Sequence, residues 1–247
     1  MKNFFRRFFK QEPIIKFEPH TGAPNLSKLT NIQLASDVTP KWLLNQRDYE
    51  NNRDKFQNCP GMTDLMRAGY IITAWDDIHL KANRQGVVCK MEKRYTEPMA
   101  KMSERVVAGI APVAEGFPLM VQKIPTPWSI TTKKGYSAFV LPATFHSPFL
   151  GDLHVYGGIN DYEEFHTVNF IFAPLKECEV FIPAGTPLLH VIPYKREEVI
   201  GATGNNTKQV TDKHRFSFPT RVRGAYRKFF HKRKIFKLEH KHLEDES

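Results

Sequence analysis

A run of short β-type segments occupies the second half of the chain and constrains its fold more than any other feature. These segments cover residues 119–124, 128–131, 136–141, 153–156, 167–172, 179–182 and 188–194, and Pro, Gly or Asp separates most of them. No helical periodicity intervenes, and strands at such short spacing pair as antiparallel neighbours. The pattern predicts a mainly β antiparallel sandwich or barrel. We expect at least six strands, and no helix longer than two turns, between residues 117 and 194.

The segment before this run predicts two short helices and a hairpin. Thr39 and Pro40 suit the cap and first turn of one helix, and residues 63–68 form one or two helical turns that Gly69 can end. A β-rich segment follows at 70–75. Residues 78–81 and 87–91 then flank a glycine-containing turn, which predicts a hairpin.

These patterns indicate one main domain with extensions. We expect an extended arm at 1–38, a β-barrel domain with short helices at its start at 39–197, a linker at 198–212, and a basic aromatic tail at 213–247. The linker includes the polar, glycine-containing run at 201–206, which is typical of a mobile connection. The tail would then be free of the barrel.

The net charge of +10 belongs to the two ends of the chain. Residues 1–20 carry five Lys or Arg against two acids, residues 213–247 carry eleven against four, and residues 21–212 carry twenty of each sign. A neutral middle with basic ends favours an anionic partner for the ends, because Lys and Arg neutralise phosphates and aromatic side chains stack on bases. The candidate contacts are Arg221, Arg223, Arg227, Lys228, Lys232, Arg233 and Lys234.

Cysteine usage and hydropathy exclude several classes of protein. Cys59, Cys89 and Cys178 are odd in number and widely spaced, which argues against a disulfide framework or a zinc finger. We expect no secretory signal and no transmembrane segment, since no apolar run has the required length. The expected location is therefore the cytoplasm, or the virion if the gene is phage-borne.

Three motifs in the β region carry a resemblance to known proteins. Residues 128–137 (WSITTKKGYS), 156–161 (YGGIND) and 183–197 (PAGTPLLHVIPYKRE) resemble an uncharacterised family of bacterial and tailed-phage proteins. Their order and spacing are also similar to the dUTPase and dCTP-deaminase superfamily. The resemblance covers about 70 of the 247 residues. It implies a distorted jelly-roll, dUTPase-like barrel, often trimeric in that superfamily.

The catalytic motifs of that superfamily are degenerate in this chain. Residues 143–145 are Ala-Thr-Phe where a dUTPase has Arg-Ser-Gly to hold phosphates. The water-activating aspartate falls on Asn160 or Asp161, depending on a one-residue gap, and an Asn could not act as a base. His190 stands where a glutamine is expected. Asp161, Asn160 and His190 are therefore the catalytic candidates that the resemblance leaves.

Four histidines in the same region raise the alternative of a metal site in a jelly-roll. The histidines are His146, His154, His166 and His190. No two of them form a His-x-His motif, and no carboxylate follows at the interval that a cupin-type metal site needs. They remain weak candidates, and we expect no cofactor.

Together these patterns predict a non-enzymatic or catalytically degenerate β-barrel accessory protein, phage-encoded, whose barrel assembles with itself or with other phage proteins. Its basic tails would contact nucleic acid or another acidic surface. The first alternative is an enzyme of dUTPase-like fold that binds or hydrolyses nucleotides. The second is a metal-dependent jelly-roll enzyme.

Overall fold

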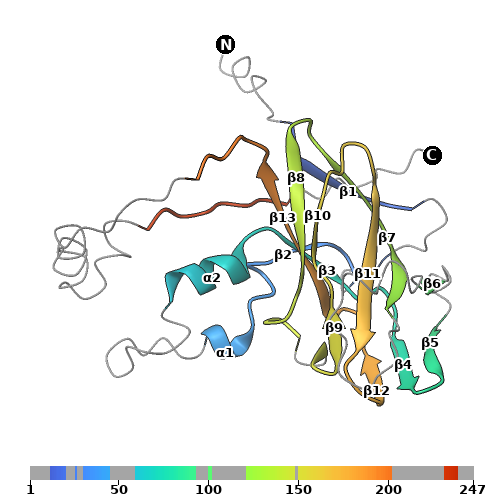
Figure 1. Ribbon diagram of the computed structural model, residues 1–247. Helices are drawn as coiled ribbons and strands as arrows, with labels where there is room; N and C mark the ends of the chain where they lie inside the picture. Colours follow the sequence, from blue (N-terminus) through green and yellow to red (C-terminus); the bar gives the residue numbers. More distant parts are fainter. Residues whose placement is uncertain are drawn as a thin grey trace, which may run out of the picture.

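The computed structural model describes residues 12–20, 26, 30–44, 59–92, 100–101, 121–147, 150–201 and 231–238. In these parts the chain is mainly β, with antiparallel pairing throughout (Figure 1). Two short helices precede most of the strands: α1, Lys41–Leu44, and α2, Pro60–Arg67. The predicted all-antiparallel β class is confirmed.

The first sheet, sheet A, is built around one long strand. Its strand order is β1-β7-β11-β9, and β6 also pairs with β7. The strands are β1, Ile15–Pro19; β6, Ala100–Lys101; β7, Gln122–Thr132; β9, Leu153–Val155; and β11, Thr167–Pro174. Side chains on β7 and β11 alternate between buried and half-buried, as expected for strands with one face in a core.

The second sheet, sheet B, has the strand order β10-β8-β13-β3-β2. Its strands are β2, Gln33–Leu34; β3, Tyr70–Thr73; β8, Tyr136–Pro142; β10, Gly158–Asn160; and β13, Pro187–Lys195. The central strand β13 pairs with β8 on one side and with β3 on the other. Residues 188–191 of β13 and all four residues of β3 are buried, so the middle of this sheet is enclosed.

The third sheet, sheet C, contains the predicted hairpin. Its order is β12-β4-β5, with β4 at Ile78–Asn83, β5 at Gly86–Met91 and β12 at Cys178–Ile182. The Asn83 side chain accepts hydrogen bonds from the backbone N–H groups of Gln85 (2.9 Å) and Gly86 (3.1 Å). Asn is favoured in turns for this reason, and the hairpin prediction is confirmed.

All three sheets contribute to one hydrophobic core. Phe170 and Phe172 of sheet A are fully buried and their rings stack at 5.0 Å between centroids. Val191 from sheet B and Ile182 from sheet C belong to the same cluster. The residue next to Val191, His190, lies on the opposite face of sheet B, because successive side chains of a strand alternate. That second face is the one that α2 approaches, because Nε2 of His190 contacts the carbonyl oxygen of Ala68 at the end of the helix.

Helix α2 ends where the sequence predicts. Gly69 follows it with φ +69°, a left-handed conformation that an L side chain rarely adopts. A Cβ at this position would lie 2.2 Å from the carbonyl oxygen of Val191. The glycine therefore allows the backbone between α2 and β3 to lie directly against β13.

Two predicted strands are one strand in the structure. The segments at 119–124 and 128–131 were expected to be separate because Pro125 and Pro127 lie between them, yet β7 continues through both prolines. The register against β11 shifts between Thr167 and Asn169, and the Thr126 hydroxyl donates to the Val168 carbonyl at 3.1 Å. A bulge with a side-chain hydrogen bond thus replaces the ladder contacts that the prolines cannot make.

The described residues of the interval 117–194 form seven strands, β7 to β13, and no helix of more than two turns. This confirms the predicted strand count. The described strands pair into three antiparallel sheets and do not close into a barrel, so the finer expectation of a distorted, dUTPase-like jelly-roll barrel stays a prediction. Strand β10 was not predicted, because glycines at 157 and 158 give it little β propensity.

Parts of the expected N-terminal arm belong to the sheets. β1 pairs with β7 from Ile15↔Thr132 to Pro19↔Trp128, and Ile15 is buried in the core. β2 pairs with β3 through Gln33↔Ile71. Residues 15–19 and 33–34 therefore add edge strands to the domain.

The C-terminal residues 231–238 lie against the folded core. The Tyr70 hydroxyl donates to the Lys237 carbonyl at 3.0 Å, and the Phe236 ring contacts the Tyr70 ring edge-to-face at 6.2 Å. Phe236 and Leu238 pack against the hydrophobic cluster. The expectation that the tail is free of the domain is wrong for these eight residues.

Within the described ranges, no helix is both long enough and apolar enough to cross a membrane.

Candidate functional site

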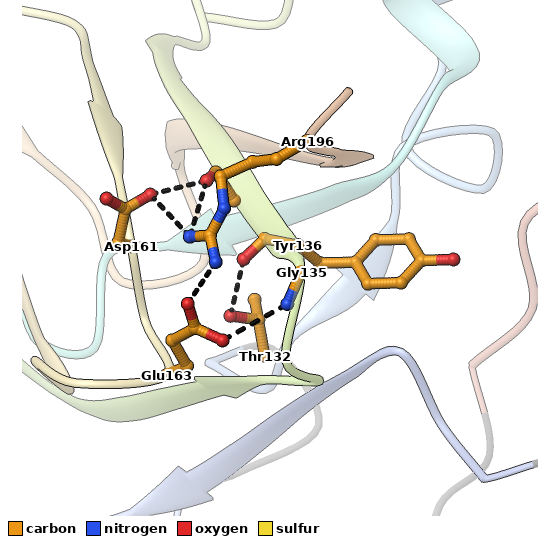
Figure 2. Close-up of polar contacts among 7 residues, drawn as sticks. Thr132, Gly135, Tyr136, Asp161, Glu163 and Arg196 are labelled. Atoms are coloured by element: carbon orange, nitrogen blue, oxygen red, sulfur yellow. Dashed lines mark hydrogen bonds and ion pairs between the residues drawn. The ribbon is translucent and has the colours of Figure 1, made fainter. Parts of the chain in front are cut away.

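An ion-pair network centred on Arg196 joins the three sequence motifs. Arg196 follows β13, and its guanidinium lies 3.1 Å from the Asp161 carboxylate and forms a second ion pair with Glu163 (Figure 2). The Ser137 hydroxyl donates to Asp161, and Nη1 of Arg196 lies 3.3 Å from the same hydroxyl oxygen. The ends of β8, β10 and β13 therefore meet at one point.

The turn between β7 and β8 completes this network. Gly135 occupies the turn with φ +84°, and its N–H donates to Glu163 at 3.1 Å. The Gly135 carbonyl accepts from the backbone N–H of Arg196 at 2.8 Å. Thr132 closes the turn from the other side, because its hydroxyl donates to the Tyr136 carbonyl at 3.1 Å (Figure 2). The glycine thus places one turn against both Glu163 and Arg196.

Charge pairing fixes the ionisation of this network. A hydrogen bond from Ser137 and, to a smaller extent, one from Arg196 hold the pKa of Asp161 below its usual range. The Arg196 hydrogen bond likewise lowers the pKa of Glu163, and Glu163 raises the pKa of Arg196. A general base needs a pKa near the operating pH. Asp161 is instead an ionised carboxylate that is bound by Ser137 and Arg196. These contacts hold the loop between β10 and β11 in place.

Asn160 faces a different partner from Asp161. Its side-chain amide donates to the Tyr162 hydroxyl at 3.2 Å. Tyr162 is 1% exposed, and burial raises the pKa of its phenol to about 12. The amide therefore stabilises a buried tyrosine.

His190 is well separated from Asn160 and Asp161. Asp161 contacts Ser137, whereas His190 pairs across the sheet with Leu141, four residues further along β8. Four residues of a strand span about 13 Å. The three catalytic candidates of the sequence therefore do not meet in one place.

The four candidate histidines also divide into separate surroundings. His154 is exposed and contacts the Tyr156 ring at 4.6 Å, and Nδ1 of His166 lies 3.1 Å from the Ile130 carbonyl oxygen. Only His146 and His190 are neighbours, with ring centroids 5.7 Å apart. In the part of the chain that the structure describes, no group of three or more His, Cys, Asp or Glu side chains could hold a metal ion.

Burial sets the protonation of the His146–His190 pair. His190 is only 4% exposed, and burial lowers its pKa. Burial and, to a smaller extent, the nearby His190 lower the pKa of His146 to about 4. Both imidazoles are therefore neutral at physiological pH.

The predicted basic site is described in part. Arg221, Arg223, Arg227 and Lys228 lie outside the described residues. Lys232 and Arg233 are exposed, and Lys234 forms an ion pair with Asp64 of α2.

The ion pairs of Asp64 with the C-terminal residues were not predicted from the sequence. Its carboxylate also binds Nε2 of His231 at 2.9 Å. Burial raises the pKa of Asp64, but the hydrogen bonds from Lys234 and His231 outweigh burial and hold the pKa below its ordinary value. No local sequence signal connects residues that are 167 and 170 positions apart.

Comparison with known proteins gives little further guidance. No protein-family model matches the chain, and no curated protein matches its sequence. Among solved structures, a mutant dUTPase from phage phi11 of S. aureus, described with a structural Mg(II) ion, superposes with a TM-score of 0.32 and 11% identity, covering 71% of this chain and 96% of that chain. A superposition at this level does not assign a family.

Proposed function

We propose that this chain is a nucleic-acid-binding accessory protein whose β domain serves as a scaffold for a basic C-terminal segment, residues 213–241. The observation that carries the proposal is the way residues 231–238 are held. Phe236, Leu238 and the Lys237 carbonyl face the domain, whereas the side chains of Lys232, Arg233 and Lys237 are exposed. Such an arrangement presents cations at a fixed place on a neutral core.

The charge distribution supports nucleic acid as the partner. Residues 213–241 contain eleven Lys or Arg and one Glu, interleaved with Phe and Tyr. Cations bind the phosphate backbone and release counterions, and aromatic rings can stack on exposed bases. The two roles together fit a nucleic acid better than they fit a lipid surface or an acidic protein.

The state of the Arg196 network supports a scaffold without nucleotide chemistry. Asp161 is bound by Ser137 and Arg196, and residues 143–145 offer no cation to a phosphate. We propose in addition that the β domain is a diverged dUTPase-like jelly-roll. The support is the sequence resemblance of its three motifs, which all contribute residues to this one network. Self-assembly of the domain stays a prediction.

Binding of a fluorescently labelled DNA duplex at low salt tests the function. The double variant Lys232→Ser with Arg233→Ser should bind several-fold more weakly than the parent. Substitutions are preferable to deletion of the tail, because deletion would also remove the Phe236 and Leu238 contacts with the core. The matched control is Lys90→Ser with Lys134→Ser, two exposed lysines elsewhere.

Equal weakening by both double variants would show a diffuse charge effect and contradict the proposal. The same protein should be tested with vesicles that contain anionic lipid. Binding to vesicles but not to DNA would assign the basic segment to a membrane surface instead.

A further inference from the structure

Two histidines on the outer face of sheet B lie edge to face beside the end of α2. His190 belongs to β13, and His146 follows β8 in a turn closed by the His146 N–H donating to the Ala143 carbonyl at 2.9 Å. Their ring centroids are 5.7 Å apart at an interplanar angle of 75°. The described structure gives this pair no role in the Arg196 network or in the basic segment.

The hydrogen bonds of both rings fix the same tautomer. Nε2 of His146 lies 3.1 Å from the carbonyl oxygen of Met66, and Nε2 of His190 contacts the carbonyl oxygen of Ala68. A carbonyl oxygen only accepts, so each Nε2 carries the proton. Each Nδ1 therefore has a lone pair available for another partner.

Two buried polar atoms in the turn that follows β8 lack partners. Nδ1 of His146 and the hydroxyl oxygen of Ser147 are buried and have no hydrogen-bond partner in the described structure. Ser147 is only 3% exposed. A buried polar group without a partner costs about 1 to 3 kcal/mol, so unsatisfied atoms in a folded protein call for an unseen water, ion or ligand.

The arrangement matches the surroundings of metal-binding histidines. Such histidines typically donate one ring nitrogen to a backbone carbonyl, which orients the other nitrogen toward the metal. With metal–nitrogen bonds of about 2.0 Å, two imidazoles on one ion place their ring centroids roughly 5 to 6 Å apart. The observed separation of 5.7 Å lies in this range. Carbonyl groups at the end of a helix also favour a nearby cation.

We propose that Nδ1 of His146, Nδ1 of His190 and the Ser147 hydroxyl bind one divalent transition-metal ion of the zinc class. Imidazole is the ligand that Zn²⁺, Cu²⁺ and Ni²⁺ share, whereas Mg²⁺ and Ca²⁺ prefer oxygen. Two neutral imidazoles and one hydroxyl give moderate affinity and leave a coordination position for solvent or for an oxygen of a bound ligand. The site is independent of the proposed nucleic-acid function.

Calorimetric titration of the full chain with ZnCl₂ tests the site. The protein should carry no histidine tag and should first be freed of metal with a chelator. We expect one equivalent to bind with a dissociation constant in the micromolar range. The variants His146→Gln and His190→Gln should each weaken binding at least about tenfold, because each removes one ligand nitrogen. Gln keeps an N–H donor for the carbonyl partner, which favours retention of the fold.

His154→Gln and His166→Gln are matched controls, because both histidines are exposed and lie away from the pair. They should bind zinc as the parent does. If His190→Gln does not fold, ¹⁵N NMR of the unmodified protein replaces it, and zinc should move the Nδ1 resonances of His146 and His190 specifically. Absence of zinc binding, or unchanged affinity in His146→Gln, would overturn the proposal and leave a water-filled histidine pair.

Discussion

The Tyr70 hydroxyl donates a 3.0 Å hydrogen bond to the carbonyl of Lys237, 167 residues further along the chain. Tyr70 begins β3 and follows Gly69, so the docked C-terminal segment reaches the same junction that joins α2 to sheet B. The Asp64 carboxylate binds His231 and Lys234 at the other end of this segment. One junction therefore holds both the helix and the basic segment.

Substitution of Phe236 tests how much the docked segment contributes to stability. Phe236→Ala should lower the free energy of unfolding by about 1 to 2 kcal/mol, because it removes apolar area and an edge-to-face contact with Tyr70. The neighbouring Ile235 is 69% exposed, so Ile235→Ala should leave stability unchanged. Urea denaturation measures both variants. Equal effects of the two would contradict the docked arrangement.

Alanine substitutions of two glycines near the ends of α2 should have opposite effects on stability. Gly69→Ala should destabilise the protein by about 2 kcal/mol or more, because the backbone has positive φ and the added Cβ would collide with the Val191 carbonyl. Gly61 lies inside α2 with open space around it, so Gly61→Ala should stabilise by a few tenths to about 1 kcal/mol. Thermal unfolding compares them. A Gly69→Ala variant as stable as the parent would refute the close approach of α2 to β13.

The His146–His190 pair predicts a pH dependence of stability. The pKa of His146 is lowered from 6.5 to about 4 in the folded protein. Between these values the unfolded chain binds a proton that the folded protein excludes, so the free energy of unfolding falls as pH decreases through this window and levels off below it. The loss between about pH 7 and about pH 4.5 should be roughly 2 kcal/mol from this group.

Chemical denaturation at both pH values, with chelator present, measures this loss. His146→Gln should show a smaller loss on acidification, whereas His154→Gln should behave as the parent. A parent-like loss in His146→Gln would place the titrating group elsewhere.

The strand pattern was readable from sequence because alternation and turn residues are local signals. The hairpin at Asn83 and the helix end at Gly69 follow from such signals. The Arg196 network was not predictable, since contacts of Ser137 with Asp161 and Arg196 depend on the order β10-β8-β13. Strand order is a property of the tertiary fold, and a short stretch of sequence does not reveal it.

The docked segment did carry an overlooked signal. Phe236 and Leu238 alternate with the exposed Lys237, which is the period of a half-buried extended chain. The aromatic residues at 226, 229 and 230 instead have the spacing of one helical face. The two spacings differ, and residues 231–238 follow the extended one.

Catalysis offers a direct test of the Arg196 network. We expect no release of pyrophosphate from dUTP or dCTP, because Asp161 is held by Ser137 and Arg196 and residues 143–145 offer no cation to a phosphate. A coupled pyrophosphate assay against a matched buffer measures this. Turnover above the buffer rate that disappears in Asp161→Ala would show that the superfamily chemistry is retained.

The salt dependence of DNA binding gives the last prediction. If about five cations of the basic segment reach phosphates, log affinity should fall with log salt at a slope of about −4. Lys234 already pairs with Asp64, so Lys232, Arg233 and Lys237 are the described residues best placed to contribute. Binding should be similar for duplexes of unrelated sequence, because phosphate contacts carry no base information.

The double variant Lys232→Ser with Arg233→Ser should make this slope shallower by about 2, since each lost phosphate contact removes about one unit. Lys90→Ser with Lys134→Ser should leave the slope unchanged, because those lysines lie outside the basic segment. Anisotropy titrations at several salt concentrations measure both. A slope near zero, or one that the tail substitutions leave unchanged, would place the nucleic-acid contact outside this segment.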